Sequence, residues 1–363
     1  MPNTPQWPPS DPSEATIMHA HRRTFLVSRR ALAVTALAAV LALAACAADE
    51  GQAAGPKPGE TATLADGRKI NLRCQGHGAP TVIFESGFGA HAGAWAKVQP
   101  TVARRTRTCA YDRAGMGLSD DGPLPRDGAA IARDLDQALT EAGIEGPYIL
   151  VGHSAGALYA RLFAARRLGE VQGLVLVDPT VEHLARPGAD GLNGIRGRLS
   201  RCLAVAEVSP PAEDARWQGC APPGDGEAAA RARAPDRWRN QLSELNAIFG
   251  PTSEAVARVG SLLNDVPAYV ITASDTAMAA PTVGYDKPQS ILELQHLRMA
   301  LSFSPGYQRT VYASHLVMND RPEVVIEAVV AMIDAAQAGK PPPALPPSET
   351  GEAVGEPGSA FPR

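Results

Sequence analysis

The chain has 363 residues, and its 34 Lys and Arg residues nearly balance 38 Asp and Glu residues, giving a formal net charge of -4. Proteins that bind nucleic acid usually carry an excess of basic residues, which this chain does not have, so we expect no nucleic-acid partner. The hydrophobic content of 45% is sufficient for a large buried core, whereas 32 prolines and 34 glycines indicate long irregular ends.

Residues 1–46 predict an export signal. Arg29 and Arg30 precede an apolar run over residues 31–46, which is too short for a membrane span of roughly 20 residues. The sequence does not decide between Met1 and Met18 as the start, nor between the Sec and twin-arginine export routes.

The last four residues of this segment, LAAC, resemble the bacterial lipobox, in which the cysteine is lipidated and becomes the first mature residue. The resemblance implies that Cys46 is a lipid anchor, although a simple cleaved signal stays open as the alternative. We therefore expect an exported lipoprotein, attached to the periplasmic side of a bacterial membrane or to the cell surface. Residues 47–59 are small and polar and predict a flexible tether.

Four cysteines remain after the tether, an even number in a chain sent to an oxidising compartment, and this predicts two disulfides. Cys202 and Cys220 share one local region and are the favoured pair. Cys74 and Cys109 fall on two predicted strands, where they form either the second pair or buried free thiols.

Short apolar runs alternate with helical patterns over residues 60–180 and 266–338. Typical strand sequences are TVIFESG, YILVGHS, LVLVDPT and PAYVITAS. This rhythm predicts an α/β fold with a mostly parallel sheet covered by helices on both faces. Between the two core segments, residues 181–265 show helical fragments without a convincing strand and predict an inserted helical cap. Residues 339–363 are Pro-rich and predict a disordered tail.

Residues 152–156, GHSAG, fit the pattern of a nucleophile elbow. A strand pattern precedes them and a helical pattern follows, which is the context that this motif requires. The two glycines permit a tight turn that exposes the Ser154 hydroxyl at the start of a helix. There the amide of Ala155 can stabilise the negative oxygen that forms when a serine attacks a carbonyl.

A serine nucleophile needs a base, and His315 is the favoured candidate because it ends a predicted strand where ligand and catalytic groups collect. His153 is expected to point away from the elbow, and His296 to be half-exposed on a helix. Two aspartates follow strands and can orient the base, namely Asp178 and Asp275. The residues themselves leave both open.

The loop after TVIFESG is expected to supply a second amide to the developing oxyanion, with Phe88 as its donor.

Five segments, ESGFGAHAGAW, CAYDRAGMGLSD, VGHSAGALYARLFAAR, LVLVDPT and ASHLVMNDRPEVVIEAV, together resemble the α/β-hydrolase superfamily, and more narrowly bacterial exported hydrolases of the esterase and lipase-like type. The resemblance spans roughly residues 64–338 and follows the family's order of nucleophile, acid and histidine. It implies a catalytic triad with Ser154 and His315, and an oxyanion hole from Phe88 and Ala155. Because the aspartate of LVLVDPT is typical of such proteins, the resemblance favours Asp178 as the acid.

The expected function is therefore that of a serine hydrolase, cleaving a carboxylic ester of a small or medium apolar molecule through an acyl-enzyme, without cofactor or metal. A serine in the elbow argues against dehalogenase and epoxide hydrolase chemistry, for which this superfamily uses an aspartate. Two alternatives stay open: an amidase or peptidase, and a non-catalytic, membrane-tethered protein that binds a small molecule. The sequence does not indicate an oligomeric state.

Overall fold

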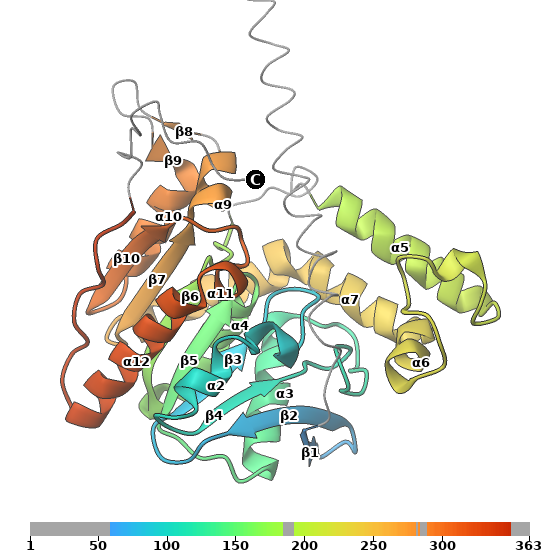
Figure 1. The fold of residues 1–363 in the computed structure, drawn as a ribbon, viewed down its shortest axis with the longest axis horizontal. Coiled ribbons are helices and arrows are strands. Elements are labelled where there is room, and N and C mark those ends of the chain that lie inside the picture. The colour runs from blue at the N-terminus through green and yellow to red at the C-terminus, as the bar shows by residue number, and fades with distance from the viewer. Residues whose placement is uncertain (1–58, 184–191, 281, 284–288, 350–363) are drawn as a thin grey trace, which may run out of the picture.

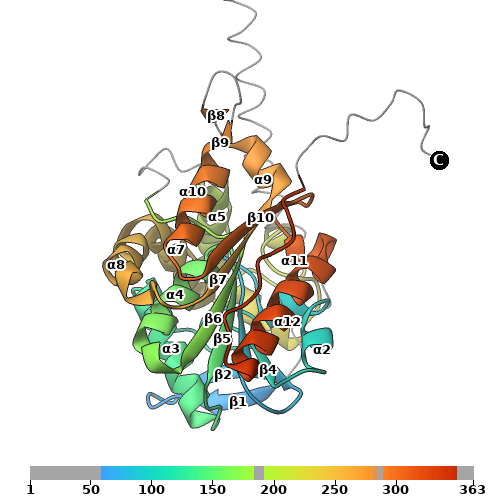
Figure 2. The same ribbon diagram turned by 90° about the vertical axis from the view of Figure 1, so that its left-hand side faces the viewer.

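The computed structural model describes residues 59–183, 192–280, 282–283 and 289–349 of the chain. These residues form a central eight-stranded sheet in the order β1-β2-β4-β3-β5-β6-β7-β10, with helices on both faces (Figures 1 and 2). Its strands are β1 (Glu60–Thr63), β2 (Lys69–Gln75), β3 (Thr81–Glu85), β4 (Thr108–Tyr111), β5 (Tyr148–His153), β6 (Val171–Val177), β7 (Ala268–Ala273) and β10 (Gly306–Val311). A separate short pair consists of β8 (Thr282–Val283) and β9 (Gln289–Ser290).

The sheet is mostly parallel. Strand β2 is antiparallel to both β1 and β4, whereas each pair of neighbours from β4 to β10 is parallel. The predicted α/β fold, with a mostly parallel sheet flanked by helices, is thereby confirmed.

Both faces of the sheet are buried, which explains why its strands read as continuous apolar runs. Along β3, Val82 and Phe84 belong to one hydrophobic core, while Ile83 between them belongs to the other. This is the two-residue alternation of an extended strand. Because the strands from β4 to β10 are parallel, their carboxyl ends lie at the same edge of the sheet, which is where loops usually form a site in such folds.

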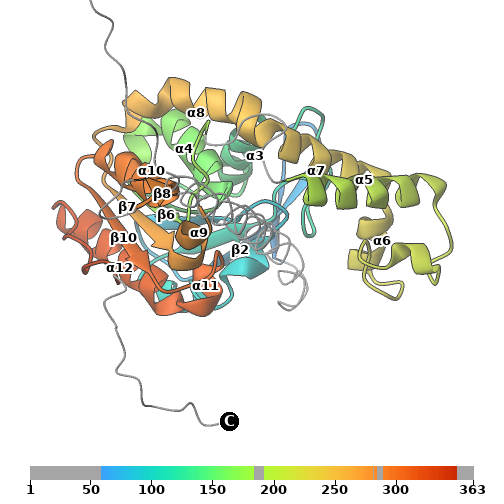
Figure 3. The same cartoon turned by 90° about the horizontal axis from the view of Figure 1, so that it is seen from above.

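The helices divide between the two faces, as Figures 2 and 3 show. One face carries α2 (Gln99–Val102), α11 (Val317–Asp320) and α12 (Pro322–Ala338); the other carries α3 (Gly128–Glu141), α4 (Gly156–Arg166), α8 (Ser253–Val259) and α10 (Ile291–Leu301). Short α9 (Ser274–Ala279) follows β7 directly.

Between β6 and β7 the described chain forms helices only. These are α5 (Asn193–Val208), α6 (Glu227–Arg233), α7 (Pro235–Ala247) and α8, with shorter turns between them. Helices α5 and α6 project beyond the sheet, and α7 connects them to α8, which packs on α4 (Figure 3). A disulfide between Cys202 and Cys220, with sulfurs 2.02 Å apart, closes the outer part of this cap.

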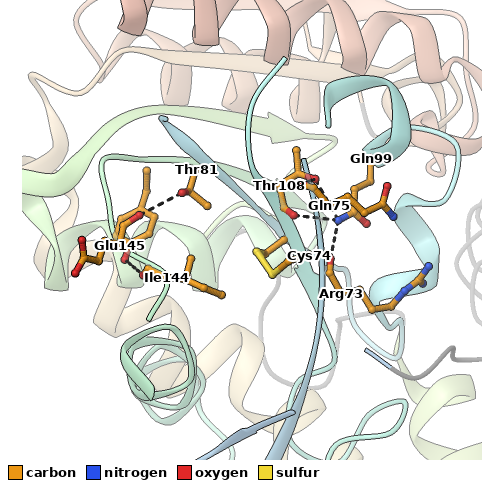
Figure 4. The surroundings of a disulfide bond; sticks show 10 residues. Arg73, Cys74, Gln75, Thr81, Gln99, Thr108, Ile144 and Glu145 are labelled. Atoms are coloured by element: carbon orange, nitrogen blue, oxygen red, sulfur yellow. Dashed lines mark hydrogen bonds between the residues drawn. A yellow bond between two sulfur atoms is a disulfide. The ribbon is translucent and has the colours of Figure 1, made fainter. Parts of the chain in front are cut away.

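The second disulfide joins Cys74 on β2 to Cys109 on β4, where the two residues lie directly opposite each other. Nearby, the side chain of Gln99 donates to the Arg73 carbonyl oxygen at 2.7 Å (Figure 4). The structure thus contains the pair favoured by the sequence, and it also bonds the two cysteines for which free thiols had stayed open.

The predicted disordered tail is wrong for residues 340–349. This segment runs beside β10 and α12, and Tyr269 donates its hydroxyl to the Pro343 carbonyl oxygen at 2.6 Å. The carboxylate of Glu349 accepts from Arg321 at 3.0 and 3.1 Å. Composition alone misjudged the segment, because its binding partners are provided by strands and helices distant in sequence.

Residues 1–58 and 350–363 lie outside the described residues, and with them lie the predicted signal, Cys46, nearly all of the tether and the end of the tail. Within the part of the chain that the structure describes, no helix has the length and apolar character to cross a membrane.

Candidate active site

Ser154 occupies the sharp turn between β5 and α4. Its φ of +51° lies in the left-handed region, which is uncommon for a residue with a side chain. The two glycines are required by close approach: a Cβ on Gly152 would lie 2.8 Å from the Ala157 Cα, and one on Gly156 would lie 2.5 Å from the Glu85 carbonyl oxygen. A side chain at Gly152 would push the start of α4 away from β5, and one at Gly156 would push it away from β3.

His315 and Asp178 are brought together from loops at the ends of different strands. The Nδ1–H of His315 donates to Oδ2 of Asp178 at 2.6 Å. Because Nδ1 holds the proton in this hydrogen bond, Nε2 is the basic nitrogen of the neutral ring. Asp178 is completely buried, whereas 15% of the His315 side chain is exposed to solvent. The His315 ring can therefore accept a proton on Nε2, and the buried Asp178 carboxylate can stabilise the positive charge that results.

The surroundings of Asp178 keep it ionised and fixed. Its carboxylate also accepts from the Ala273 amide at 3.0 Å and from the Thr276 hydroxyl at 2.7 Å. Burial alone would raise the pKa of Asp178, but the hydrogen bond and charge of His315, with a smaller contribution from His296, lower it below its ordinary value. By contrast, Asp275 is exposed on α9 and accepts from its neighbour Ser274. The structure places Asp178, and not Asp275, against His315.

His153 does not point away from the site as expected. Its ring is 1% exposed and lies 4.6 Å, centroid to centroid, from the ring of His315. Its Nε2–H donates to the His315 carbonyl oxygen at 2.9 Å. Burial, followed by the charge of His315, lowers the pKa of His153 to about 3, so the ring is neutral. His153 holds the backbone of His315 beside the elbow.

His296, expected to be half-exposed, is fully buried. Its Nε2–H donates to the Pro179 carbonyl oxygen at 2.8 Å, and its Nδ1 accepts from the Thr272 hydroxyl at 2.9 Å. The helix α10 presents this histidine to the sheet and not to solvent. It fixes the turn immediately after Asp178, a role that helical periodicity alone did not indicate.

The amides of Phe88 and Ala155 are available to a ligand. Neither forms a backbone or side-chain hydrogen bond with any residue that the structure describes. The two loops are in close contact, since a Cβ on Gly87 would lie 3.3 Å from the Ser154 Cβ. Two unpaired amides on loops that touch beside Ser154 are the kind of donors that an oxyanion hole needs, so the assignment of Phe88 and Ala155 to this role stays a prediction.

Beneath the Phe88 loop lies a buried charged cluster that sequence reasoning missed. Glu85 accepts from Arg113 at 2.8 Å and from the hydroxyl of Tyr111, and Arg113 also donates to Glu244 of α7 at 2.8 Å. Burial is the main cause that raises the pKa of Glu85 to about 7, although Arg113 and Tyr111 oppose the shift. The sequence feature that could have indicated this cluster is the glutamate at the end of an otherwise apolar strand, TVIFE.

Across the described ranges, no group of three or more His, Cys, Asp or Glu side chains is placed to hold a metal ion. The arrangement of serine, histidine, aspartate and free amides is instead suited to nucleophilic chemistry on a carbonyl.

Comparison with curated proteins gives partial matches. The chain is 44% identical over 81 residues to an uncharacterised protein of Schizosaccharomyces pombe, covering 22% of this chain and 15% of the relative. It is 31% identical over 142 residues to a putative carbamate hydrolase, RutD, of Azorhizobium caulinodans, covering 39% of this chain and 49% of the relative. The chain thus spans less than half the length of either relative.

Among solved structures, an enol-lactonase from Burkholderia xenovorans LB400 has a similar fold, with a TM-score of 0.56 at 17% identity. The match covers 76% of this chain and 100% of the lactonase. A model of the alpha/beta hydrolase family matches residues 82–328, which is more than half of the chain and includes Ser154, Asp178 and His315. The chain belongs to the alpha/beta hydrolase family.

Proposed function

We propose that the protein is a serine hydrolase that cleaves a carboxylic ester of a small or medium apolar molecule. The observation that carries this proposal is the 2.6 Å hydrogen bond from His315 to the buried Asp178, held by His153 next to the strained Ser154. A buried carboxylate whose pKa is lowered chiefly by a histidine, close to the serine of the elbow, is the arrangement that marks a functional site. The enol-lactonase of similar fold also acts on an ester by its name.

In the proposed reaction, the Ser154 hydroxyl attacks the ester carbonyl while Nε2 of His315 accepts its proton. The amides of Phe88 and Ala155 stabilise the tetrahedral oxyanion. The C–O bond to the leaving alcohol then breaks, and the alcohol takes the proton from His315. Water, deprotonated by the same nitrogen, hydrolyses the acyl-enzyme and restores the serine. Asp178 keeps the imidazole oriented throughout.

Covalent labelling with a fluorophosphonate, located by peptide mass spectrometry, tests this proposal. We expect one label, on Ser154, and none in the Ser154→Ala variant. His315→Ala should slow labelling by several orders of magnitude because the serine loses its base. If the folded wild-type protein takes no label, the chemistry is absent and the alternative, a tethered protein that only binds an apolar molecule, replaces it.

We also propose that the protein is exported and anchored to a bacterial membrane through a lipid on Cys46. The support is the sequence LAAC, small residues and a cysteine, that ends the apolar segment. In a bacterial host supplied with an alkyne-tagged fatty acid, the full chain should carry the tag in the membrane fraction, and Cys46→Ser should not. A wild-type protein that is released untagged would refute the anchor.

A further inference from the structure

The buried charged cluster connects three separate parts of the molecule. It consists of Glu85 at the end of β3, Tyr111 and Arg113 at the end of β4, Tyr159 on α4, and Glu244 on the cap helix α7. Arg113 is at its centre, 2% exposed, and its guanidinium carbon lies 5.1 Å from the centre of the Tyr159 ring. A buried arginine is costly unless all of its charge is matched, so this arrangement needs an explanation.

Arg113 also binds the backbone of the loop that leads to Phe88. Its Nη1 donates to the Ser86 carbonyl oxygen at 2.6 Å, and its Nη2 donates to the Gly87 carbonyl oxygen at 2.8 Å. With Glu85 and Glu244, these contacts use all four hydrogens of the two terminal nitrogens. The arginine therefore clamps two successive peptides of this loop.

Holding the Gly87 oxygen also fixes the Phe88 amide, because both belong to the same peptide plane. In a trans peptide the carbonyl oxygen and the amide hydrogen point to opposite sides. The cis bonds among the described residues all precede proline, so the bond between Gly87 and Phe88 is trans. Arg113 draws the oxygen inward, and the Phe88 N–H consequently faces away from the cluster, on the loop that touches Ser154.

The cap takes part through Glu244. Its Oε1 accepts from Arg113 at 2.8 Å and from the Tyr159 hydroxyl at 3.1 Å, and the side chain is 2% exposed. Helix α7 lies between the outer cap helix α5 and α8, which packs on the core (Figure 3). Withdrawal of α7 would remove the second carboxylate from Arg113 and leave its Nη2 with the Gly87 oxygen alone.

We propose that Arg113 is a positioning residue that aims the Phe88 amide at the oxyanion, and that Glu244 makes this alignment depend on a docked cap. This inference rests on the proposed serine hydrolase function. It gives the cap a role in the chemical step.

The test compares Arg113→Lys with wild type in hydrolysis of p-nitrophenyl butyrate. Lysine keeps the charge but has one nitrogen, which cannot hold two carbonyls and two carboxylates in this geometry. We expect kcat to fall about 10²-fold, as for loss of an oxyanion donor, with KM changed less than about twofold. Affinity for phenylboronic acid, which forms a tetrahedral adduct with the serine, should fall in parallel with kcat.

Two further variants keep the test decisive. Glu244→Gln has the same shape without the charge, and we expect about a tenfold fall in kcat because its hydrogen bond to Arg113 is weaker. Glu207→Gln is the matched control, since Glu207 pairs with Arg239 on the exposed side of the cap, and its kcat should equal that of wild type. Glu244→Gln decides the outcome if Arg113→Lys does not fold.

All rates are divided by the number of sites that fluorophosphonate labels at completion, which removes the effect of unfolded molecules. A wild-type rate per labelled site in both Arg113→Lys and Glu244→Gln would overturn the inference while leaving the hydrolase intact. If wild type itself is neither labelled nor active, the proposed function fails, and the inference fails with it.

Discussion

The ring of His153 lies 4.6 Å from the ring of His315 and donates a hydrogen bond to the carbonyl oxygen of that same residue at 2.9 Å. One histidine thus holds the backbone of the other, while Asp178 holds its side chain. The arrangement requires His153 to be neutral, because a second positive charge at this distance would oppose protonation of His315.

This neutrality makes stability depend on pH. Burial and the neighbouring His315 lower the folded pKa of His153 to about 3, from an ordinary value of 6.5. The unfolded chain therefore binds the extra proton between these values, so the stabilisation is complete above about pH 6.5 and is lost as pH falls toward 3. The limiting slope is about 1.4 kcal/mol per pH unit. His153→Gln can keep the donor without titrating, and urea unfolding from pH 7 to 4 should show a shallower slope.

His77→Gln, on an exposed loop, is the control and should retain the wild-type slope. Parallel pH profiles for wild type and His153→Gln would show that His153 is not the group responsible.

Asp178→Asn should reduce kcat roughly 10³- to 10⁴-fold, because an amide cannot stabilise the imidazolium and can favour the wrong tautomer. The matched control is Asp275→Asn, which alters the same residue type just after the neighbouring strand β7, where the side chain is exposed and accepts from Ser274. Its kcat should stay within about twofold of wild type. Hydrolysis of p-nitrophenyl butyrate measures both, and equal losses would argue against Asp178 as the orienting acid.

Gly156→Ala should destabilise the fold, since the new Cβ would lie 2.5 Å from the Glu85 carbonyl oxygen and 2.6 Å from that of Ser86. The expected loss is roughly 1–3 kcal/mol, the usual range for an overpacked buried position. Gly197→Ala is its control: it lies on the exposed side of α5, with nothing within 4 Å of the added atom. There alanine should stabilise the helix by up to about 1 kcal/mol. Urea midpoints for the two variants should move in opposite directions, and a shared direction would contradict the steric argument.

The double substitution Cys202→Ser with Cys220→Ser should loosen the outer cap. The two cysteines are 18 residues apart, and a bridge closing a loop of this size contributes roughly 2–4 kcal/mol. We expect a protease to cut between α5 and α7 earlier than in wild type, while the sheet resists cleavage. Unchanged protease resistance of the cap would mean that helix packing alone holds it.

The elements of the candidate site were predictable from the sequence where the constraint on them is local. The elbow is five consecutive residues, and its glycines are required by contacts within the turn and with one adjacent strand. The apolar run leading into it, YILVGH, is typical of a strand buried on both faces. By contrast, Arg113 and Glu244 meet across 131 positions of sequence. That contact depends on how the cap packs against the core, and no local sequence pattern around either residue predicts it.

His296 illustrates the same limit at shorter range. Its helix has no strong polar face, so periodicity could not tell a buried position from a half-exposed one. The choice between Asp178 and Asp275 also depended on tertiary structure, because both aspartates follow strands. His315 binds Asp178, whose own backbone turns with a φ of +41°.

The segment after α12 affects how readily one molecule can associate with another. Strand β10 is the last of the sheet, and an open edge strand is a template on which another chain can add and begin aggregation. Here Ser348 accepts from the Thr310 amide at 2.9 Å, and the Glu349 amide donates to the Thr310 oxygen at 2.8 Å. The Pro-rich tail occupies the edge that a second molecule would need, and its prolines cannot themselves extend the sheet.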